Sequence, residues 1–106
     1  MAYKVKTISA FERQAKRLIK KYHSLQKELL DLVKDLKENP EQGTSLGNNC
    51  YRLSIASKGK GKSGGARIIT NIVIEDETVY LLSIYDKSEQ GDISNKELQE
   101  LLKQIP

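Results

Sequence analysis

The alternation of hydrophobic and polar residues predicts one strand and two helices in the first part of the chain. From Ala2 to Thr7, apolar and basic side chains alternate with a period of two, which is typical of a half-buried strand. From Ser9 to Tyr22, and again from Ser24 to Leu36, apolar residues recur every three or four positions. Because almost nothing separates these two amphipathic helices, we expect them to form an antiparallel hairpin.

Short polar signals predict where the helices begin and end. Ser9 with Glu12, and Ser94 with Glu97, each fit a capping box, in which a hydroxyl and a carboxylate satisfy the free amides of a helix N-terminus. The second of these pairs opens a final helix. Asn39–Pro40 predicts the end of the second helix, because proline cannot continue it.

The second half of the chain predicts three consecutive strands between turn-rich loops. The strands are expected at Cys50–Ala56, Arg67–Ile74 and Val79–Tyr85, and the loops at Gln42–Asn49 and Ser57–Gly65. The order β-α-α-β-β-β-α indicates a single α+β domain over residues 1–106. We expect the helical hairpin to pack on one face of a small, mainly antiparallel sheet. The other face is then free to form a shallow basic cleft.

The distribution of charge is more informative than its total. The chain has 18 basic and 14 acidic residues, a net charge of +4. Between Gln42 and Ile74 there are five basic residues and no acidic one, which leaves 13 basic against 14 acidic elsewhere. The whole positive excess therefore lies in one central third. Such a concentration predicts a surface that binds a polyanion.

Length and residue usage exclude several classes of protein. With 106 residues and no long apolar run, the chain is too short for two domains and lacks a membrane-spanning segment. A single cysteine and no signal-peptide core favour a cytoplasmic protein. The only histidine, His23, excludes a two-histidine ribonuclease mechanism. No residues have metal-ligand spacing, so we expect no metal and no cofactor.

A loop of alternating glycine and lysine is the first candidate for chemistry. It carries Lys58, Lys60 and Lys62, which share one side if the segment is extended. Residues 56–63 formally fit a nucleotide-binding phosphate loop, but a strand follows them where that motif requires a helix. We therefore interpret the loop as a binder of backbone phosphates. Arg67 on the following strand and Arg52 on the neighbouring strand are expected to converge on the same phosphate.

The end of the last strand is the second candidate. Tyr85 alternates with Ile84, so its ring is expected to point away from the core and to stack on a base or take part in proton transfer. Lys87 follows two residues later and is expected to contact phosphate or carry a proton.

Two stretches carry a resemblance to a known family. Residues 56–69, ASKGKGKSGGARII, and residues 79–89, VYLLSIYDKSE, resemble the RelE/HigB family of bacterial toxin–antitoxin toxins, most of all its HigB-like subgroup. The predicted order of elements also matches that family. The resemblance implies a RelE-like microbial ribonuclease fold. It further implies an endoribonuclease that enters the ribosomal A site, cuts mRNA and thereby arrests translation and growth, without a metal.

By matching position, the resemblance assigns candidate roles to seven residues. It implies a catalytic set of Arg67, Tyr85, Lys87 and Lys60, and an RNA-binding set of Arg52, Lys58 and Lys62. Two positions depart from the family. Ser54 stands where a further basic residue is usual, and Asp86, where a small residue is common, adds a negative charge beside the expected site.

The resemblance also implies partners. A toxin implies a cognate antitoxin, encoded adjacently, that carries a DNA-binding helix-turn-helix, and its other partners are the ribosome and mRNA. No membrane partner and no sequence-specific DNA binding by this chain are expected. Two alternatives on the same fold stay open: a ParE-like poison of DNA gyrase, and a non-toxic RNA-binding module.

Overall fold

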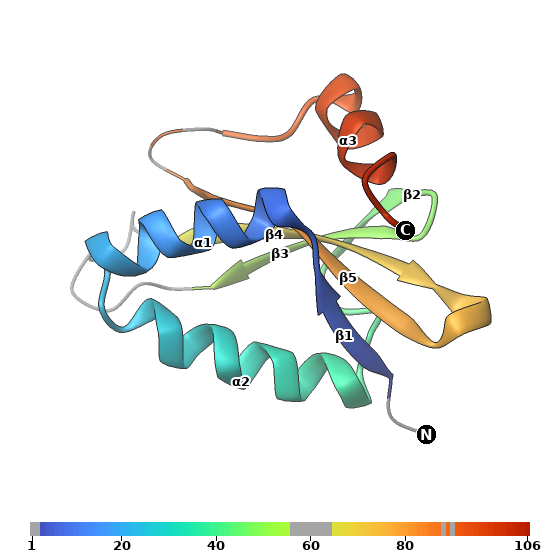
Figure 1. Ribbon diagram of the computed structural model, residues 1–106, viewed down its shortest axis with the longest axis horizontal. Helices are drawn as coiled ribbons and strands as arrows, with labels where there is room; N and C mark the ends of the chain where they lie inside the picture. Colours follow the sequence, from blue (N-terminus) through green and yellow to red (C-terminus); the bar gives the residue numbers. More distant parts are fainter. Residues whose placement is uncertain (1–2, 56–64, 88, 90) are drawn as a thin grey trace.

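The described part of the chain, residues 3–55, 65–87, 89 and 91–106 of this computed structural model, forms a five-stranded sheet and three α-helices (Figure 1). The elements are β1 (Lys4–Thr7), α1 (Ser9–Lys21), α2 (Leu25–Glu38), β2 (Thr44–Gly47), β3 (Cys50–Ile55), β4 (Ala66–Val73), a 3-10 turn η1 (Ile74–Asp76), β5 (Thr78–Asp86) and α3 (Asn95–Leu102). This arrangement confirms the predicted α+β class. It adds one strand, β2, to the predicted order.

The sheet has the strand order β1-β5-β4-β3-β2. The first strand runs parallel to β5, and every other neighbouring pair is antiparallel, so the sheet is mainly antiparallel as predicted. Because β5 lies between β1 and β4, it is a central strand, and all nine of its residues are buried. A strand buried on both faces must be covered on both sides.

The helical hairpin covers one face of the sheet, as predicted. Helices α1 and α2 run in opposite directions side by side, and α1 contacts β5 (Figure 1). Their apolar stripes contribute Leu18, Leu25 and Leu36, which are fully buried in one cluster with the paired strand residues Ile68 and Ile84. The period-3.6 pattern therefore identified the core face of each helix correctly.

The second face of the sheet is not free, contrary to the prediction. The short helix α3 contacts β5, lies apart from the hairpin in Figure 1, and buries Leu98. The segment that leads into α3 passes over the arginines of β3 and β4, as described below. The sequence pattern places Leu98 inward but does not show which face α3 covers.

The strand β2 lies within the segment that the sequence predicts as a loop. It pairs with β3 through a two-residue turn at Asn48 and Asn49, whose φ angles of 52° and 60° are those of a tight hairpin. Asparagine tolerates this left-handed backbone better than most residues. Before the strand, Gly43 has a φ of 91°, and a Cβ there would overlap the Arg52 carbonyl oxygen. The chain just before β2 thus lies in close contact with the backbone of β3 at Arg52.

The two predicted capping boxes have different outcomes. Ser94 is the N-cap of α3, and its hydroxyl oxygen accepts a hydrogen bond of 3.1 Å from the Glu97 amide, as predicted. Ser9 is not a cap, because α1 begins one residue earlier than predicted and Ile8 takes the N-cap position. The Glu12 carboxylate instead accepts a hydrogen bond from the Thr7 hydroxyl. At the far end of the hairpin, α2 stops at Glu38 as predicted.

Candidate functional site

Three neighbouring strands bring polar side chains together on the face opposite the helical hairpin. In the antiparallel register, Ser54 on β3 lies opposite Arg67 on β4, and Arg67 lies opposite Tyr85 on β5. Directly paired residues point to the same face of a sheet, and so do residues two apart along a strand. Arg52 therefore shares this face. We call Arg52, Arg67 and Tyr85 the arginine cluster. The structure thus brings together three of the residues that the sequence nominates.

The segment before α3 contacts both arginines of the cluster. An Arg52 Nη1 lies 2.8 Å from the Asp92 Oδ2, and the Arg67 Nη1 donates a hydrogen bond to the Gly91 carbonyl oxygen. The Asp92 Oδ1 accepts from the Ile93 amide at 2.8 Å. That bond first, and Arg52 second, lower the pKa of Asp92, so the carboxylate is charged at neutral pH.

Tyr85 is buried in the hydrophobic core cluster, contrary to the prediction that its ring points away from the core, and its hydroxyl has no hydrogen-bond partner among the described residues. The Nε of the facing Arg67 is also buried without a described partner. Burial raises the pKa of the Tyr85 phenol, and the nearby Arg67 guanidinium opposes that rise without forming a hydrogen bond of good geometry. The phenol is therefore protonated at neutral pH. Two buried donors on adjacent strands thus have no acceptor within the described part of the chain.

Lys87 follows β5 and is exposed to solvent. Its backbone amide donates a hydrogen bond of 3.1 Å to the Gly65 carbonyl oxygen. The backbone of Lys87 therefore lies next to Gly65, the residue that precedes β4. The loop residues Lys58, Lys60 and Lys62 lie outside the described residues, so their predicted roles rest on the sequence.

Asp86, which is expected to add a negative charge beside the site, does not share the face of the arginine cluster. It alternates with Tyr85 and points to the opposite face, where it is 1% exposed. The Tyr22 hydroxyl donates a hydrogen bond of 2.6 Å to its Oδ2, and the Lys21 Nζ lies 3.6 Å from the same oxygen. Asp86 therefore fastens the end of β5 to the end of α1. The other departure, Ser54, is exposed beside Arg67 and carries no charge.

Three residues of this region were missed by sequence reasoning. Gly91 and Asp92 contact the arginines, and Glu89 forms an ion pair of 3.2 Å with Arg17 of α1. No local pattern in the sequence signals these contacts, because their partners lie 24 to 72 residues away. A glycine followed by aspartate indicates only a turn.

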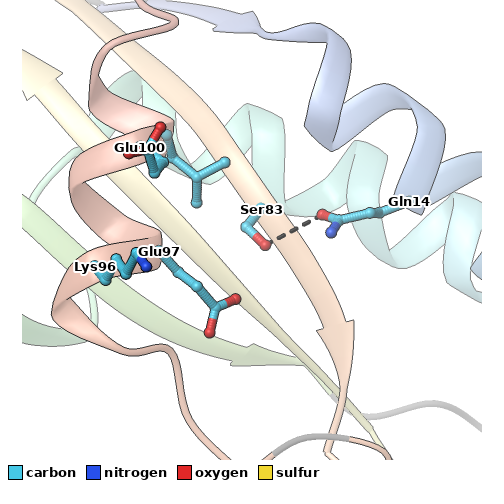
Figure 2. A pocket seen from close by; sticks show the side chains of 6 residues that line it. Gln14, Ser83, Lys96, Glu97 and Glu100 are labelled. Atoms are coloured by element: carbon cyan, nitrogen blue, oxygen red, sulfur yellow. Dashed lines mark hydrogen bonds between the residues drawn. The ribbon is translucent and has the colours of Figure 1, made fainter.

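A hollow of about 280 Å³ lies between α1, β5 and α3, but its chemistry differs from that of the arginine cluster (Figure 2). Glu97 and Glu100 line it from α3, while Gln14 and Ser83 form a hydrogen bond of 3.1 Å across it. The Gln14 Oε1 also accepts a hydrogen bond of 3.2 Å from the Ile84 amide, which lies beyond the part of β5 that pairs with β1. With these two carboxylates and only one lysine, Lys96, the lining has a net negative charge, which disfavours a phosphate here. The arginine cluster is therefore the better candidate for a phosphate site.

Within the described ranges, no three His, Cys, Asp or Glu side chains group as metal ligands would. No helix of the described chain combines the length and the apolar character that crossing a membrane requires.

Solved structures define the fold class to which this arrangement belongs. An arginine-to-alanine double mutant of the E. coli toxin RelE in the free state is similar over 100% of both chains, with a TM-score of 0.65 and 19% identity. The intact E. coli RelBE toxin–antitoxin complex covers 78% of this chain and 94% of its own, with a TM-score of 0.60 and 17% identity. A RelBE2 toxin–antitoxin complex from Mycobacterium tuberculosis covers 79% and 96%, with a TM-score of 0.52 and 14% identity. At these identities the likeness shows the fold alone.

The family follows from the sequence itself. Residues 3–105 match the family described as the RelE toxin of the RelE/RelB toxin–antitoxin system. Because the match spans nearly the whole chain, this protein belongs to the RelE toxin family.

Proposed function

We propose that this protein is the toxin of a type II toxin–antitoxin module and acts as a ribosome-dependent, metal-independent mRNA endoribonuclease that cuts in the A site. The observation that carries the proposal is the pairing of Arg67 with Tyr85 across β4 and β5, with a buried donor on each left unpartnered within the described chain. The Tyr85 hydroxyl beside the Arg67 guanidinium suits the non-bridging oxygens of a phosphodiester.

The cleavage step assigns a role to each group. The 2′-oxygen of the RNA forms a bond to the adjacent phosphorus while the bond from phosphorus to the 5′-oxygen breaks. A base accepts the proton of the 2′-hydroxyl, and an acid donates one to the departing 5′-oxygen. Arg67 neutralises the charge that develops on the five-coordinate phosphorus. Tyr85 donates a hydrogen bond or orients the nucleotide, because its protonated phenol is not a base at neutral pH.

The remaining charged groups supply proton transfer and binding. Lys87 and Lys60 are the proposed carriers of protons, with Lys58 and Lys62 as phosphate contacts beside Arg52. Positioning and charge stabilisation then account for the rate without histidine.

The proposed partners follow from the same function. An antitoxin with a helix-turn-helix, encoded adjacently, covers the basic cleft or blocks its entry into the ribosome. The E. coli and M. tuberculosis neighbours that are toxin–antitoxin complexes support an antitoxin as a partner. The ribosome and its mRNA are the targets, and the cytoplasm is the compartment where they meet.

The test is cleavage of a defined mRNA on programmed ribosomes, mapped by primer extension. We expect cuts confined to the A-site codon, and a loss of about 10²- to 10³-fold in rate for Arg67→Ala, as for other removed oxyanion donors. Arg13→Ala, which removes an exposed arginine from α1, is the matched control and should cleave normally. Thermal unfolding of both variants separates lost chemistry from lost folding.

Other outcomes have defined meanings. Equal cleavage of free RNA contradicts the ribosome dependence. Folded wild-type protein that makes no cuts contradicts the nuclease and favours a gyrase poison or a non-toxic RNA-binding module. Unchanged cleavage by Arg67→Ala removes the arginine cluster from the mechanism.

A further inference from the structure

Two successive residues of this chain already provide acceptors for both arginines of the cluster. Asp92 offers a carboxylate oxygen to Arg52, and Gly91 offers its carbonyl oxygen to Arg67. The two strands that carry the arginines are adjacent, and the acceptors come from a segment 24 to 40 residues further along. The chain thus contacts its own cationic site with an anion.

The Asp92 carboxylate has the chemistry of the ligand proposed for this site. A carboxylate and a phosphodiester each carry one negative charge and present two oxygens to a guanidinium, and arginine pairs with both groups in the same geometry. An oxygen of an RNA phosphate cannot take the place on the Arg52 Nη1 that the Asp92 Oδ2 holds at 2.8 Å. We propose that Asp92 is an internal stand-in for an RNA phosphate at Arg52, and that it thereby sets the affinity of the arginine cluster for RNA. This inference rests on the proposed function.

The side-chain exposure of Asp92 and Arg52 indicates which of the two moves when RNA binds. The Asp92 side chain is 57% exposed, whereas that of Arg52 is 25% exposed and projects from a paired strand. An ion pair with so much solvent access is weak and can be exchanged for another anion. Arg52 stays in place for the incoming phosphate, and the Asp92 side chain turns into solvent.

The exchange does not require α3 to leave the sheet. The helix is capped by Ser94 through its own bond to the Glu97 amide, and Leu98 is buried independently of Asp92. The exchange at Arg52 therefore requires the Asp92 side chain to rotate and to give up its bond from the Ile93 amide, but it does not require the departure of α3. The Asp92 carboxylate therefore competes with RNA phosphates for the Arg52 guanidinium, and its local concentration is fixed because it belongs to the same chain.

Binding of an uncleavable RNA tests this role directly. We would measure the affinity of a fluorescent, fully 2′-O-methylated RNA hexamer for the full-length protein by anisotropy. Asp92→Asn keeps an oxygen for the Ile93 amide but removes the charge. We expect it to bind about two- to fivefold more tightly than wild type, within the range that exposed ion pairs allow. Asp31→Asn, on the exposed face of α2, makes the same change in net charge elsewhere and should gain less.

A second background assigns the gain to Arg52. In Arg52→Gln protein, adding Asp92→Asn should change the affinity no more than Asp31→Asn does, because the competing contact is already gone. An Asp92→Asn gain equal to that of Asp31→Asn, a loss of affinity, or no RNA binding by any of the proteins would each overturn the inference. A-site cleavage by wild type, scored separately on ribosomes, reports on the proposed function and can succeed while this inference fails.

Discussion

Tyr85 and Asp86 are adjacent buried polar residues, but their side chains have different roles. Both lie in β5 and are nearly inaccessible, but they point to opposite faces of the sheet. Asp86 is met by Tyr22 and Lys21 and holds the hairpin to the strand. The Tyr85 hydroxyl has no partner among the described residues, which is a cost to folding that a functional role would explain.

Tyr85→Phe should therefore separate stability from activity. Removing a buried, unpartnered hydroxyl should leave the free energy of unfolding unchanged or raise it by up to about 1 kcal/mol. Cleavage on programmed ribosomes should fall about tenfold or more, because a donor to the phosphate is lost. Chemical unfolding and primer extension measure the two effects. A clear loss of stability would reveal a partner for the hydroxyl, and unchanged cleavage would exclude it from the chemistry.

The same substitution has a signature in pH. Burial raises the pKa of Tyr85 above its ordinary value near 10, so the folded state holds the phenol proton more tightly than the unfolded state. This contribution to stability is fully present below about pH 10 and is lost as the pH rises toward the folded-state pKa. Tyr85→Phe should remove that part of the alkaline decline. Wild-type cleavage should show no rise between pH 6 and 9 that depends on Tyr85.

At the scale of elements, the sequence predicts the long elements with a periodic apolar pattern and misses the shortest strand. The helices α1 and α2 were predicted because each repeats its apolar stripe over several turns. The four-residue strand β2 has no buried residue and only Leu46 partly buried, so it lacks a detectable alternation. Its only signal is the asparagine pair at 48 and 49. The cap at Ser9 was wrong because a one-residue shift in a helix start is within the uncertainty of any local pattern.

The two serines give the element scale a matched experiment. Ser94→Ala should lower the free energy of unfolding by about 1 kcal/mol, because it removes the acceptor for the Glu97 amide at the start of an eight-residue helix. Ser9→Ala should have little effect, since Ser9 caps nothing and alanine is a good helix former. Urea denaturation of both variants measures the difference. Ser94→Asn should restore most of the loss, and equal effects of the two alanine variants would contradict the assigned caps.

At the scale of the whole molecule, the site was predictable only as far as it follows strand alternation. Arg52, Arg67 and Tyr85 share a face because a period of two and an antiparallel register require it, and both can be inferred from the sequence. The contacts of Gly91 and Asp92 with that face could not be inferred. They depend on the path of the chain between β5 and α3, which no local pattern fixes. The cover over the arginines therefore emerges only in three dimensions.

The concentration of positive charge in one third of the chain leads to the last prediction, which concerns how the molecule meets RNA. If only net charge mattered, any three lysines would contribute equally to binding.

Replacing Lys58, Lys60 and Lys62 by glutamine lowers the net charge from +4 to +1. Replacing Lys27, Lys34 and Lys37, which are exposed on α2, lowers it equally. If the loop lysines contact phosphates, only the first triple variant releases fewer counterions from the RNA on binding. Its slope of log affinity against log salt for single-stranded RNA should become shallower by about 2, at about 0.7 per contact. Anisotropy titrations of the uncleavable hexamer at several salt concentrations measure both slopes. Equal slopes for the two triple variants would mean that the loop acts only through the long-range field and not by contact with the RNA backbone.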